Sequence, residues 1–205
     1  GIIDAPNHRT SHKVETPRGG GIVFVTLWFF GVFFSYLQQK ISSELCFSLL
    51  GPVGLVAVVS FCDDYYNLRR RYRLISHYLA SILCLFVLYH MGLNFNSIDL
   101  SYSFCVYLLV AFAMTWSINL YNFMDGLDGL ASTQSVFIFF VSGCLLYYQG
   151  DSELGYLSCL LAFSVLGFLV WNWPSAKIFM GDVGSTSLGL AVAVFLLLAH
   201  KHQSL

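Results

Sequence analysis

The sequence predicts an all-α, multi-pass transmembrane protein. Of its 205 residues, 57% are hydrophobic and only 10% are charged, whereas about 25% of the residues of an ordinary soluble domain are charged. Apolar runs of about 17 to 20 residues recur along the chain, and each can cross a hydrocarbon core of about 30 Å as a helix. This composition excludes a water-soluble globule and a disordered chain.

The apolar runs predict about seven spans in a single membrane-embedded domain, residues 1–205. The spans cover residues 20–38, 45–62, 74–92, 104–121, 131–148, 154–173 and 184–200. Residues 1–19 are polar and form a cytoplasmic segment before the first span. Because six more spans follow, the first is not expected to be a cleavable signal peptide. The six cysteines lie singly in apolar runs, without the paired spacing of a metal or redox site.

The distribution of basic residues predicts the orientation of the chain. Threading it through seven spans leaves two basic residues, Lys40 and Lys201, on one side of the membrane. The other side receives Arg9, Lys13, Arg18, Arg69, Arg70, Arg71, Arg73 and Lys177. By the positive-inside rule this second side is cytoplasmic, so the amino terminus is inside. The net charge of −1 gives no electrostatic reason to expect nucleic acid as a partner, and the expected environment is the lipid bilayer.

The same threading places five aspartates on the cytoplasmic side: Asp63, Asp64, Asp125, Asp128 and Asp182. Their surroundings are apolar, as in FCDDYY, NFMDGLDGL and IFMGDVGS. A single aspartate of this kind is commonly a solvated helix end. A group of them in apolar sequence favours a shaped pocket, because an aspartate at mid-bilayer costs about 2.5 to 3.5 kcal/mol and needs a cation or a basic partner.

Four amide and carboxyl side chains recur at every third position: Asn119, Asn122, Asp125 and Asp128. Neighbouring members of this series share a helix face. A short 3₁₀ stretch would gather all four on one side, and the nearby glycines permit such tightening or a break. The last three of these side chains are therefore predicted to converge.

Magnesium is the predicted cation, with manganese as an alternative. Magnesium prefers oxygen ligands and usually takes one or two carboxylates, with waters and substrate phosphates completing its shell. The remaining acids are then available as a general base, as a nucleophile, or to orient arginines. Zinc is not expected, since no Cys or His lies in the group with ligand spacing.

The basic run RRRYR, residues 69–73, has two interpretations. It can be a topology signal that contacts anionic lipid. Alternatively, Arg71 and Arg73 at alternate positions beside the membrane bind a phosphate in forked geometry. The stretch GDVGST, residues 181–186, opens the last span, where backbone amides can face a phosphate. Phe179 precedes Asp182 by three residues and can stack on a base.

Four motifs occur in a fixed order along the chain: GIIDAPNHRTSHKVETPRGGG, DD at residues 63–64, NLYNFMDGLDGLAS and IFMGDVGST. This order resembles the polyprenyl-phosphate N-acetylhexosamine-1-phosphate transferases of glycosyltransferase family 4. The unbroken TPRGGG and NLYNFMDGLDG look most like the branch that initiates O-antigen and enterobacterial common antigen. That branch is related to the phospho-MurNAc-pentapeptide translocase.

The resemblance implies a magnesium-dependent phosphotransferase in the bacterial inner membrane, with its active site facing the cytoplasm. A UDP-N-acetylhexosamine would give its sugar-1-phosphate to undecaprenyl phosphate, releasing UMP and starting a lipid-linked, O-antigen-like glycan of lipopolysaccharide or cell wall. The family also suggests a homodimer.

The resemblance assigns roles to individual positions. It implies catalytic roles for Asp63, Asp64, Asp125 and Asp128, with the choice between base and nucleophile left open. The metal ligands would be Asp182 and Asp125. Of the predicted substrate-binding residues, the resemblance supplies Asn122 and Phe179, with Phe179 stacked on uracil. The rest of the predicted set comprises Asn119, Lys13, and the two arginines of the basic run, Arg71 and Arg73.

Two other functions compete with this one. The family usually has ten or eleven spans and a later cytoplasmic loop rich in His and Arg, so seven spans suggest a fragment of a longer transferase, or a truncated and inactive remnant. A seven-span transporter or receptor would instead place its ionisable residues near the bilayer midplane.

Overall fold

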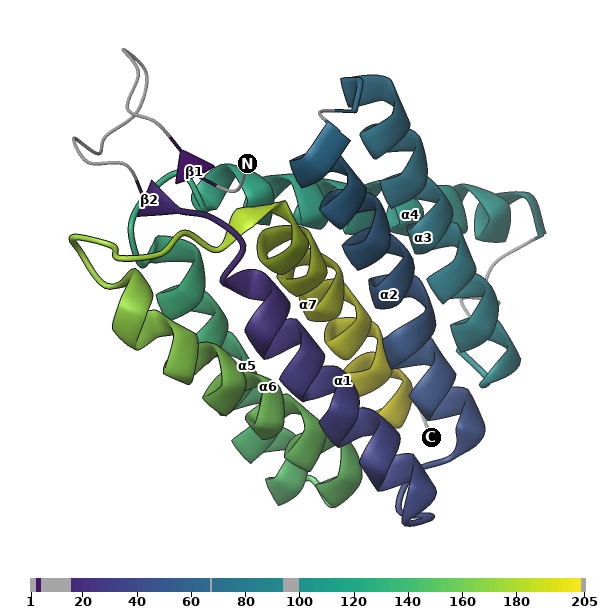
Figure 1. The fold of residues 1–205 in the computed structure, drawn as a ribbon. Helices are drawn as coiled ribbons and strands as arrows, with labels where there is room; N and C mark the ends of the chain where they lie inside the picture. The colour runs from purple at the N-terminus through teal and green to yellow at the C-terminus, as the bar shows by residue number, and fades with distance from the viewer. Residues whose placement is uncertain (1–2, 5–15, 67, 94–99, 204–205) are drawn as a thin grey trace.

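The computed structural model describes residues 3–4, 16–66, 68–93 and 100–203, and nearly all of these residues are helical (Figure 1). The helices are α1 (Gly21–Leu37), α2 (Ser43–Tyr66), α3 (Arg70–His90), α4 (Leu100–Met124), α5 (Leu130–Tyr148), α6 (Ser152–Asn172) and α7 (Gly181–Gln203). Two short strands, β1 (Ile3–Asp4) and β2 (Thr16–Pro17), pair antiparallel, with Ile3 opposite Pro17. The predicted all-α membrane fold is confirmed.

Each helix overlaps one predicted span. Six of them, α2 to α7, have the length and hydropathy to cross a membrane, while α1 has 17 residues, at the lower limit of about 17 that a span requires. Several helices extend beyond the apolar runs. In particular, α2 continues through Asp63 and Asp64 to Tyr66, because polar residues at a helix end keep their backbone hydrogen bonds although they lower the hydropathy.

Successive helices alternate in direction, so polar ends far apart in the sequence meet at one end of the bundle (Figure 1). At this end α1, α3, α5 and α7 begin and α2, α4 and α6 finish. The loops 125–129 and 173–180 lie there too. The opposite end holds the turn that contains Lys40 and the turn before α6. The loops that the sequence assigns to one side of the membrane thus lie at one end of the bundle, and every predicted site residue that the structure describes lies at or near that end.

Helix α7 is the centre of the bundle. It packs against α1, α2, α3, α4 and α5 and is the most buried of the candidate spans. Hydroxyl groups join it to its neighbours: Ser60 Oγ of α2 lies 2.8 Å from Thr186 Oγ1, and Ser117 of α4 donates to the Gly189 carbonyl at 2.7 Å. Since lipid is as apolar as leucine, close packing and such interhelical hydrogen bonds are what hold membrane helices together.

The beginnings of α1 and α7 touch through two glycines. A Cβ atom on Gly21 would lie 2.4 Å from the Gly184 Cα, and one on Gly184 would lie 2.7 Å from the Gly21 Cα. The opposing atoms are backbone, so they cannot rotate away as a side chain can. This contact fixes the amino terminus of α7 against the segment that leads into α1.

Gly184→Ala is therefore expected to push α1 away from α7 and to lower the free energy of unfolding by about 1 to 3 kcal/mol, as overpacking does. The measurement is the midpoint of thermal unfolding in detergent. Gly167→Ala in α6 is the matched control, because a Cβ there meets nothing within 4 Å and alanine favours helix over glycine. Equal midpoints for the two variants would contradict the close contact.

Candidate functional site

An arginine in the first turn of α3 bridges two aspartates from different helices. Arg73 Nη1 lies 2.9 Å from Asp63 Oδ2 in the last turns of α2, and Arg73 Nη2 lies 2.9 Å from Asp182 Oδ2 at the start of α7. The side chains of Asp63 and Asp182 are only 8% and 14% exposed. Two carboxylates this close together and this far from water require the shared cation, so Arg73 holds three helix ends in place.

Asn122 adds α4 to this arrangement. Its Oδ1 accepts from Arg73 Nη2 at 3.2 Å, and its Nδ2 donates to Asp182 Oδ1 at 3.0 Å and to Ser185 Oγ at 3.1 Å. The Asn122 side chain thus accepts a hydrogen bond from the arginine through its oxygen and donates one to the Asp182 carboxylate through its nitrogen. The sequence predicted that Asn122, Arg73 and Asp182 would lie on the same side of the membrane, and the structure brings these three side chains into direct contact.

The amino terminus of α7 binds two further carboxylates. The backbone N–H of Gly181 donates to Asp125 Oδ2 at 3.2 Å, and Asp64 accepts from the backbone of Asp182. Negative groups are stabilised at this position by the helix dipole and the unpaired amides. The sequence indicated that these amides could face a phosphate, and in the structure the carboxylates of Asp125 and Asp64 accept hydrogen bonds from them instead.

The TPRGGG segment runs beside the IFMGD segment. The Phe179 N–H donates to the Pro17 carbonyl at 2.8 Å, the Gly19 and Gly20 N–H groups donate to the Phe179 carbonyl, and the Gly21 N–H donates to Met180. Gly181 lies in the left-handed region, with φ of 78°, and a Cβ on it would press on Gly19 N at 3.2 Å. Glycine is suited to this position because it has no Cβ.

This pairing brings in a residue that the sequence analysis missed. Arg18 was counted only as a topology signal, yet in the structure it interacts electrostatically with Asp64 and Asp125. The available sequence signal was its position in TPRGGG, on the same predicted side as the aspartates. We use the name acid–arginine cluster for Asp63, Asp64, Asp125, Asp182, Arg18 and Arg73.

The cluster carries more negative than positive charge. Its four carboxylates and two guanidinium groups leave a formal excess of two negative charges. Burial raises the pKa of Asp125 to about 7, and the carboxylates of Asp182 and Asp64 act in the same direction, against the Gly181 N–H and Arg18. A further cation at the cluster would favour the ionised form of Asp125.

The remaining predicted site residues lie outside the cluster. Asn119 is exposed and donates to the Thr115 carbonyl of its own helix at 2.7 Å. Asp128 Oδ2 accepts from the Ala176 N–H at 3.0 Å and so ties the loop 125–129 to the loop 173–180. Arg71 is exposed and lies over the Tyr72 ring.

Two other predicted positions complete the set. Phe179 is half-buried, and its backbone joins the two motifs described above. Lys13 lies outside the described residues. The predicted substrate and catalytic roles of these positions stay predictions.

The predicted convergence of Asn122, Asp125 and Asp128 is only partly found. Asn122 and Asp125 both reach the start of α7, whereas Asp128 reaches the loop before it. The chain is α-helical to Met124, and 3₁₀-type hydrogen bonds begin only at the Gly126 N–H. The tightening that would have gathered all four polar side chains therefore comes too late for Asn119.

Asn172, at the end of α6, is a buried anchor that the sequence analysis also missed. Its Oδ1 accepts from the Gly129 N–H at 3.1 Å and from Ser132 Oγ at 2.9 Å, while its Nδ2 donates to the Ile178 carbonyl at 3.1 Å. One amide thereby holds together the end of the DGLDG turn and the segment that leads into α7. This linkage positions Asp125 against Gly181.

The donor chemistry of the cluster fits a hard divalent cation. The described residues contain no group of three or more His, Cys, Asp or Glu side chains that would enclose a metal by themselves. Magnesium does not need such a group, since it binds through one or two carboxylates plus waters and phosphates. All the anionic side chains of the cluster are carboxylates, and carboxylate oxygens are ligands that magnesium prefers.

Comparisons with known proteins agree with the motifs. Residues 46–200 match the sequence family described as glycosyl transferase family 4. Similar proteins include phospho-N-acetylmuramoyl-pentapeptide-transferases of Listeria monocytogenes (29% identity; 92% of this chain, 63% of the relative) and Streptococcus pneumoniae (30% identity; 98% and 64%). The Campylobacter lari protein of that name is 31% identical over 86% of this chain and 58% of its own length. The chain therefore spans less than two thirds of the length of these relatives. Because the family match covers most of its residues, the chain belongs to glycosyl transferase family 4.

Proposed function

We propose that this protein transfers an N-acetylhexosamine-1-phosphate from a UDP-sugar to undecaprenyl phosphate and releases UMP. The reaction would take place at the cytoplasmic face of the bacterial inner membrane and start a lipid-linked surface glycan. The observation that supports this proposal is the acid–arginine cluster. Segments from across the chain supply its four carboxyl and two guanidinium groups at one end of a membrane bundle.

The proposed chemistry matches these groups. An oxygen of the acceptor phosphate attacks the β-phosphorus of the nucleotide sugar, the bond from that phosphorus to the bridging oxygen breaks, and UMP leaves with the bridging oxygen. Phosphoryl transfer depends mainly on positioning and on neutralising the phosphate charges. A bound divalent ion would neutralise the diphosphate.

The protein's own residues would position the two phosphates. Arg18 and Arg73 are the guanidinium groups at the cluster, and arginine is suited to forked hydrogen bonds with phosphate. Asp182 and Asp125 are the proposed magnesium ligands. Asp63, which Arg73 holds, and Asp64, which is exposed at the end of α2, are proposed to handle the acceptor phosphate.

The identity of the sugar has two candidates. The motifs TPRGGG and NLYNFMDGLDG favour an N-acetylhexosamine donor of the O-antigen-initiating type. The names of the similar proteins favour a phospho-N-acetylmuramoyl-pentapeptide donor instead. A homodimer, which the family resemblance implies, is checked by the mass of the purified protein in detergent.

The test is transfer of radiolabel to undecaprenyl phosphate in membranes that contain this chain, or a version with the length of its relatives. The donors are UDP-GlcNAc, 6-deoxy UDP-HexNAc sugars and UDP-MurNAc-pentapeptide. We expect label in the lipid fraction with a UDP-HexNAc donor, in the presence of Mg²⁺, and equimolar release of UMP. Activity of the longer version alone would identify this chain as an inactive remnant, and no transfer by either version would refute the proposed function.

A further inference from the structure

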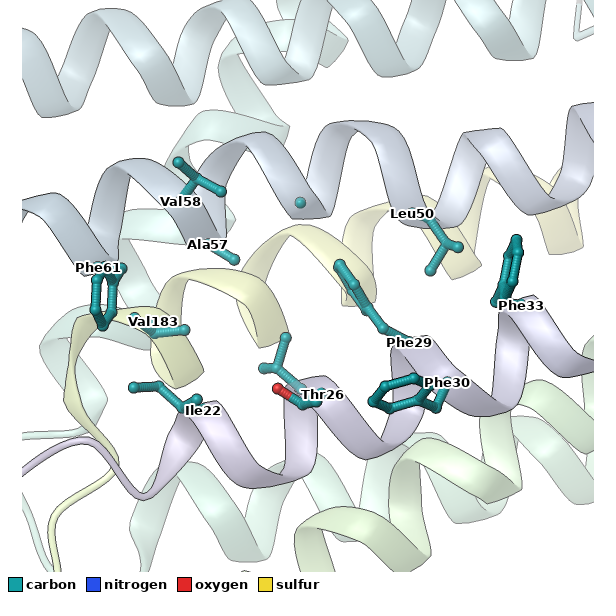
Figure 2. Close-up of a pocket in the computed structure, with 12 residues that line it drawn as sticks. Ile22, Thr26, Phe29, Phe30, Phe33, Leu50, Ala57, Val58, Phe61 and Val183 are labelled. Carbon is teal, nitrogen blue, oxygen red and sulfur yellow. The ribbon is translucent and has the colours of Figure 1, made fainter.

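Two cysteines from neighbouring helices lie together away from the acid–arginine cluster. The apolar groove that α1, α2 and α7 line offers no thiol, amine or carboxyl group, because Thr26 is the one polar side chain among its lining residues (Figure 2). The thiols of Cys144 on α5 and Cys159 on α6, by contrast, interact directly with each other. The sequence analysis found no paired spacing among the six cysteines, so helix packing alone creates this pair.

Helices α5 and α6 lie side by side and approach closely, because each has a glycine in their interface (Figure 1). A Cβ on Gly155 would lie 2.8 Å from the Gly143 carbonyl oxygen, and a Cβ on Gly143 would lie 2.9 Å from the Gly155 carbonyl oxygen. Small residues let the backbones of membrane helices come together in this way. Short side chains beside these glycines can therefore meet across the interface.

The Cys159 side chain occupies the space beside Gly143. A Cβ on Gly143 would lie 2.5 Å from Cys159 Sγ, and Cys144 is the next residue of α5. A disulfide requires two Cα atoms about 4.4 to 6.8 Å apart. The contact between the glycine backbones is what allows facing residues of two helices to come within such a range.

Both thiols lie toward the end of the bundle opposite the acid–arginine cluster. Cys144 is four residues before the last residue of α5, or about 6 Å along the helix. Cys159 is seven residues after the first residue of α6, or about 10 Å. By the orientation predicted from the basic residues, this end faces away from the cytoplasm, toward the side where disulfides form and persist.

We propose that Cys144 and Cys159 are a site of reversible oxidation, at which hydrogen peroxide converts the two thiols into a disulfide that joins α5 to α6. Cys144 is exposed and Cys159 is half-buried, so a small uncharged oxidant reaches Cys144 first. This inference does not depend on the proposed transfer reaction.

The oxidation takes two steps. The Cys144 sulfur attacks one peroxide oxygen, the O–O bond breaks, and the thiol proton leaves with the departing hydroxide as water, which gives a sulfenic acid. The Cys159 sulfur then attacks the sulfenic sulfur, the S–O bond breaks, and a second water carries away the Cys159 proton. The peroxide gains two electrons, and each sulfur loses one.

The disulfide would clamp the two helices that meet at the DGLDG turn. At the other end of the pair, the Gly129 N–H donates to Asn172 Oδ1 at 3.1 Å. A cross-link between Cys144 and Cys159 removes the unfolded conformations in which α5 and α6 are far apart, and so favours the folded state. The oxidised protein should therefore resist heat better than the reduced protein.

The first test counts thiols. The full chain in phosphatidylglycerol–phosphatidylethanolamine vesicles is treated with the lowest dose of hydrogen peroxide that changes its mass, denatured and alkylated with a maleimide, and its intact mass is measured. Of the six cysteines, we expect all six to be alkylated before oxidation, four after it, and six again after reduction with dithiothreitol. Before alkylation, the oxidised chain should be lighter by two hydrogen atoms.

Cys144→Ser and Cys105→Ser are the matched variants, since both residues are exposed cysteines. With five of the six cysteines left, Cys144→Ser should keep all five thiols through the treatment, whereas Cys105→Ser should fall from five to three. Six alkylated thiols in the oxidised, unmodified protein, or the loss of two thiols from Cys144→Ser, would overturn the proposal. A disulfide between two chains, seen as a dimer on a non-reducing gel, would also overturn it.

The second test is the midpoint of thermal unfolding in detergent. Oxidation should raise the midpoint by at least about 5 °C in the unmodified protein and in Cys105→Ser, and should not change it in Cys144→Ser. An unchanged midpoint in an unmodified protein whose disulfide has formed would refute the clamp. If both thiols stay reduced in the version with the length of the relatives, a further segment covers them and the proposal fails for the whole protein.

Discussion

Arg73→Ala is expected to reduce transfer at least 100-fold and to lower the free energy of unfolding by about 2 to 4 kcal/mol. The variant leaves Asp63 and Asp182 close together without the cation that both contact at 2.9 Å, and a buried charge that loses its partner costs about 3 to 5 kcal/mol. The expected loss of unfolding free energy is set below that range because the Arg73 side chain is 27% exposed, so water can screen the two carboxylates in the variant. Label transfer and unfolding in detergent measure the two effects.

The physical reason can be tested separately from the loss of activity. If repulsion between the two carboxylates causes the instability, then Asp63→Asn in the Arg73→Ala background restores most of the lost stability without restoring transfer. Arg71→Ala is the matched control, because Arg71 lies in the same turn of α3 but is exposed over Tyr72. A double variant as unstable as Arg73→Ala would contradict this explanation.

Asp182→Asn is expected to reduce magnesium-dependent transfer by about 100- to 1,000-fold, the scale found when one preorganised electrostatic group is removed from an active site. The substitution keeps the shape of the side chain and removes one charge from the proposed cation site. Stability should change by less than about 1 kcal/mol, because the weakened contact with Arg73 is offset by less repulsion from Asp63 and Asp64. The measurement is the transfer rate across a Mg²⁺ titration, together with membrane insertion.

Asp151→Asn serves as the control for this charge change. Asp151 lies at the opposite end of the bundle, where its Oδ1 accepts from the Leu154 N–H at 3.0 Å as the cap of α6, and asparagine caps helices equally well. Transfer by this variant should equal that of the unmodified protein. If Asp182→Asn retained full magnesium-dependent turnover, the assignment of Asp182 to the metal would be wrong.

The sequence predicted the helices well because membrane spans have a strong local signal. Each apolar run of about 20 residues became one helix, and alternation of direction was enough to place the three acidic motifs at one end. Asp63, Asp125 and Asp182 could therefore be grouped before any contact was known. The helix ends were less well predicted, because Asp63 and Asp64 lower the hydropathy without ending α2.

The individual contacts could not be predicted, because they depend on rotation about a helix axis and on pairing between distant segments. Asn119 lies three residues before Asn122, so in a regular α-helix it points about 60° away, and the structure shows it exposed. Arg18 joins the cluster only because residues 17–21 pair with residues 179–180. No periodicity in the sequence indicates that pairing.

The proposed function requires the acid–arginine cluster to hold a divalent cation together with a nucleotide phosphate. Electron paramagnetic resonance of free Mn²⁺, titrated into the detergent-solubilised protein with UMP present, measures this directly. One saturable site should appear, with an affinity that falls at least tenfold in Asp182→Asn and Asp125→Asn and is unchanged in Asp151→Asn. Equal Mn²⁺ affinity in all four proteins would contradict the claim.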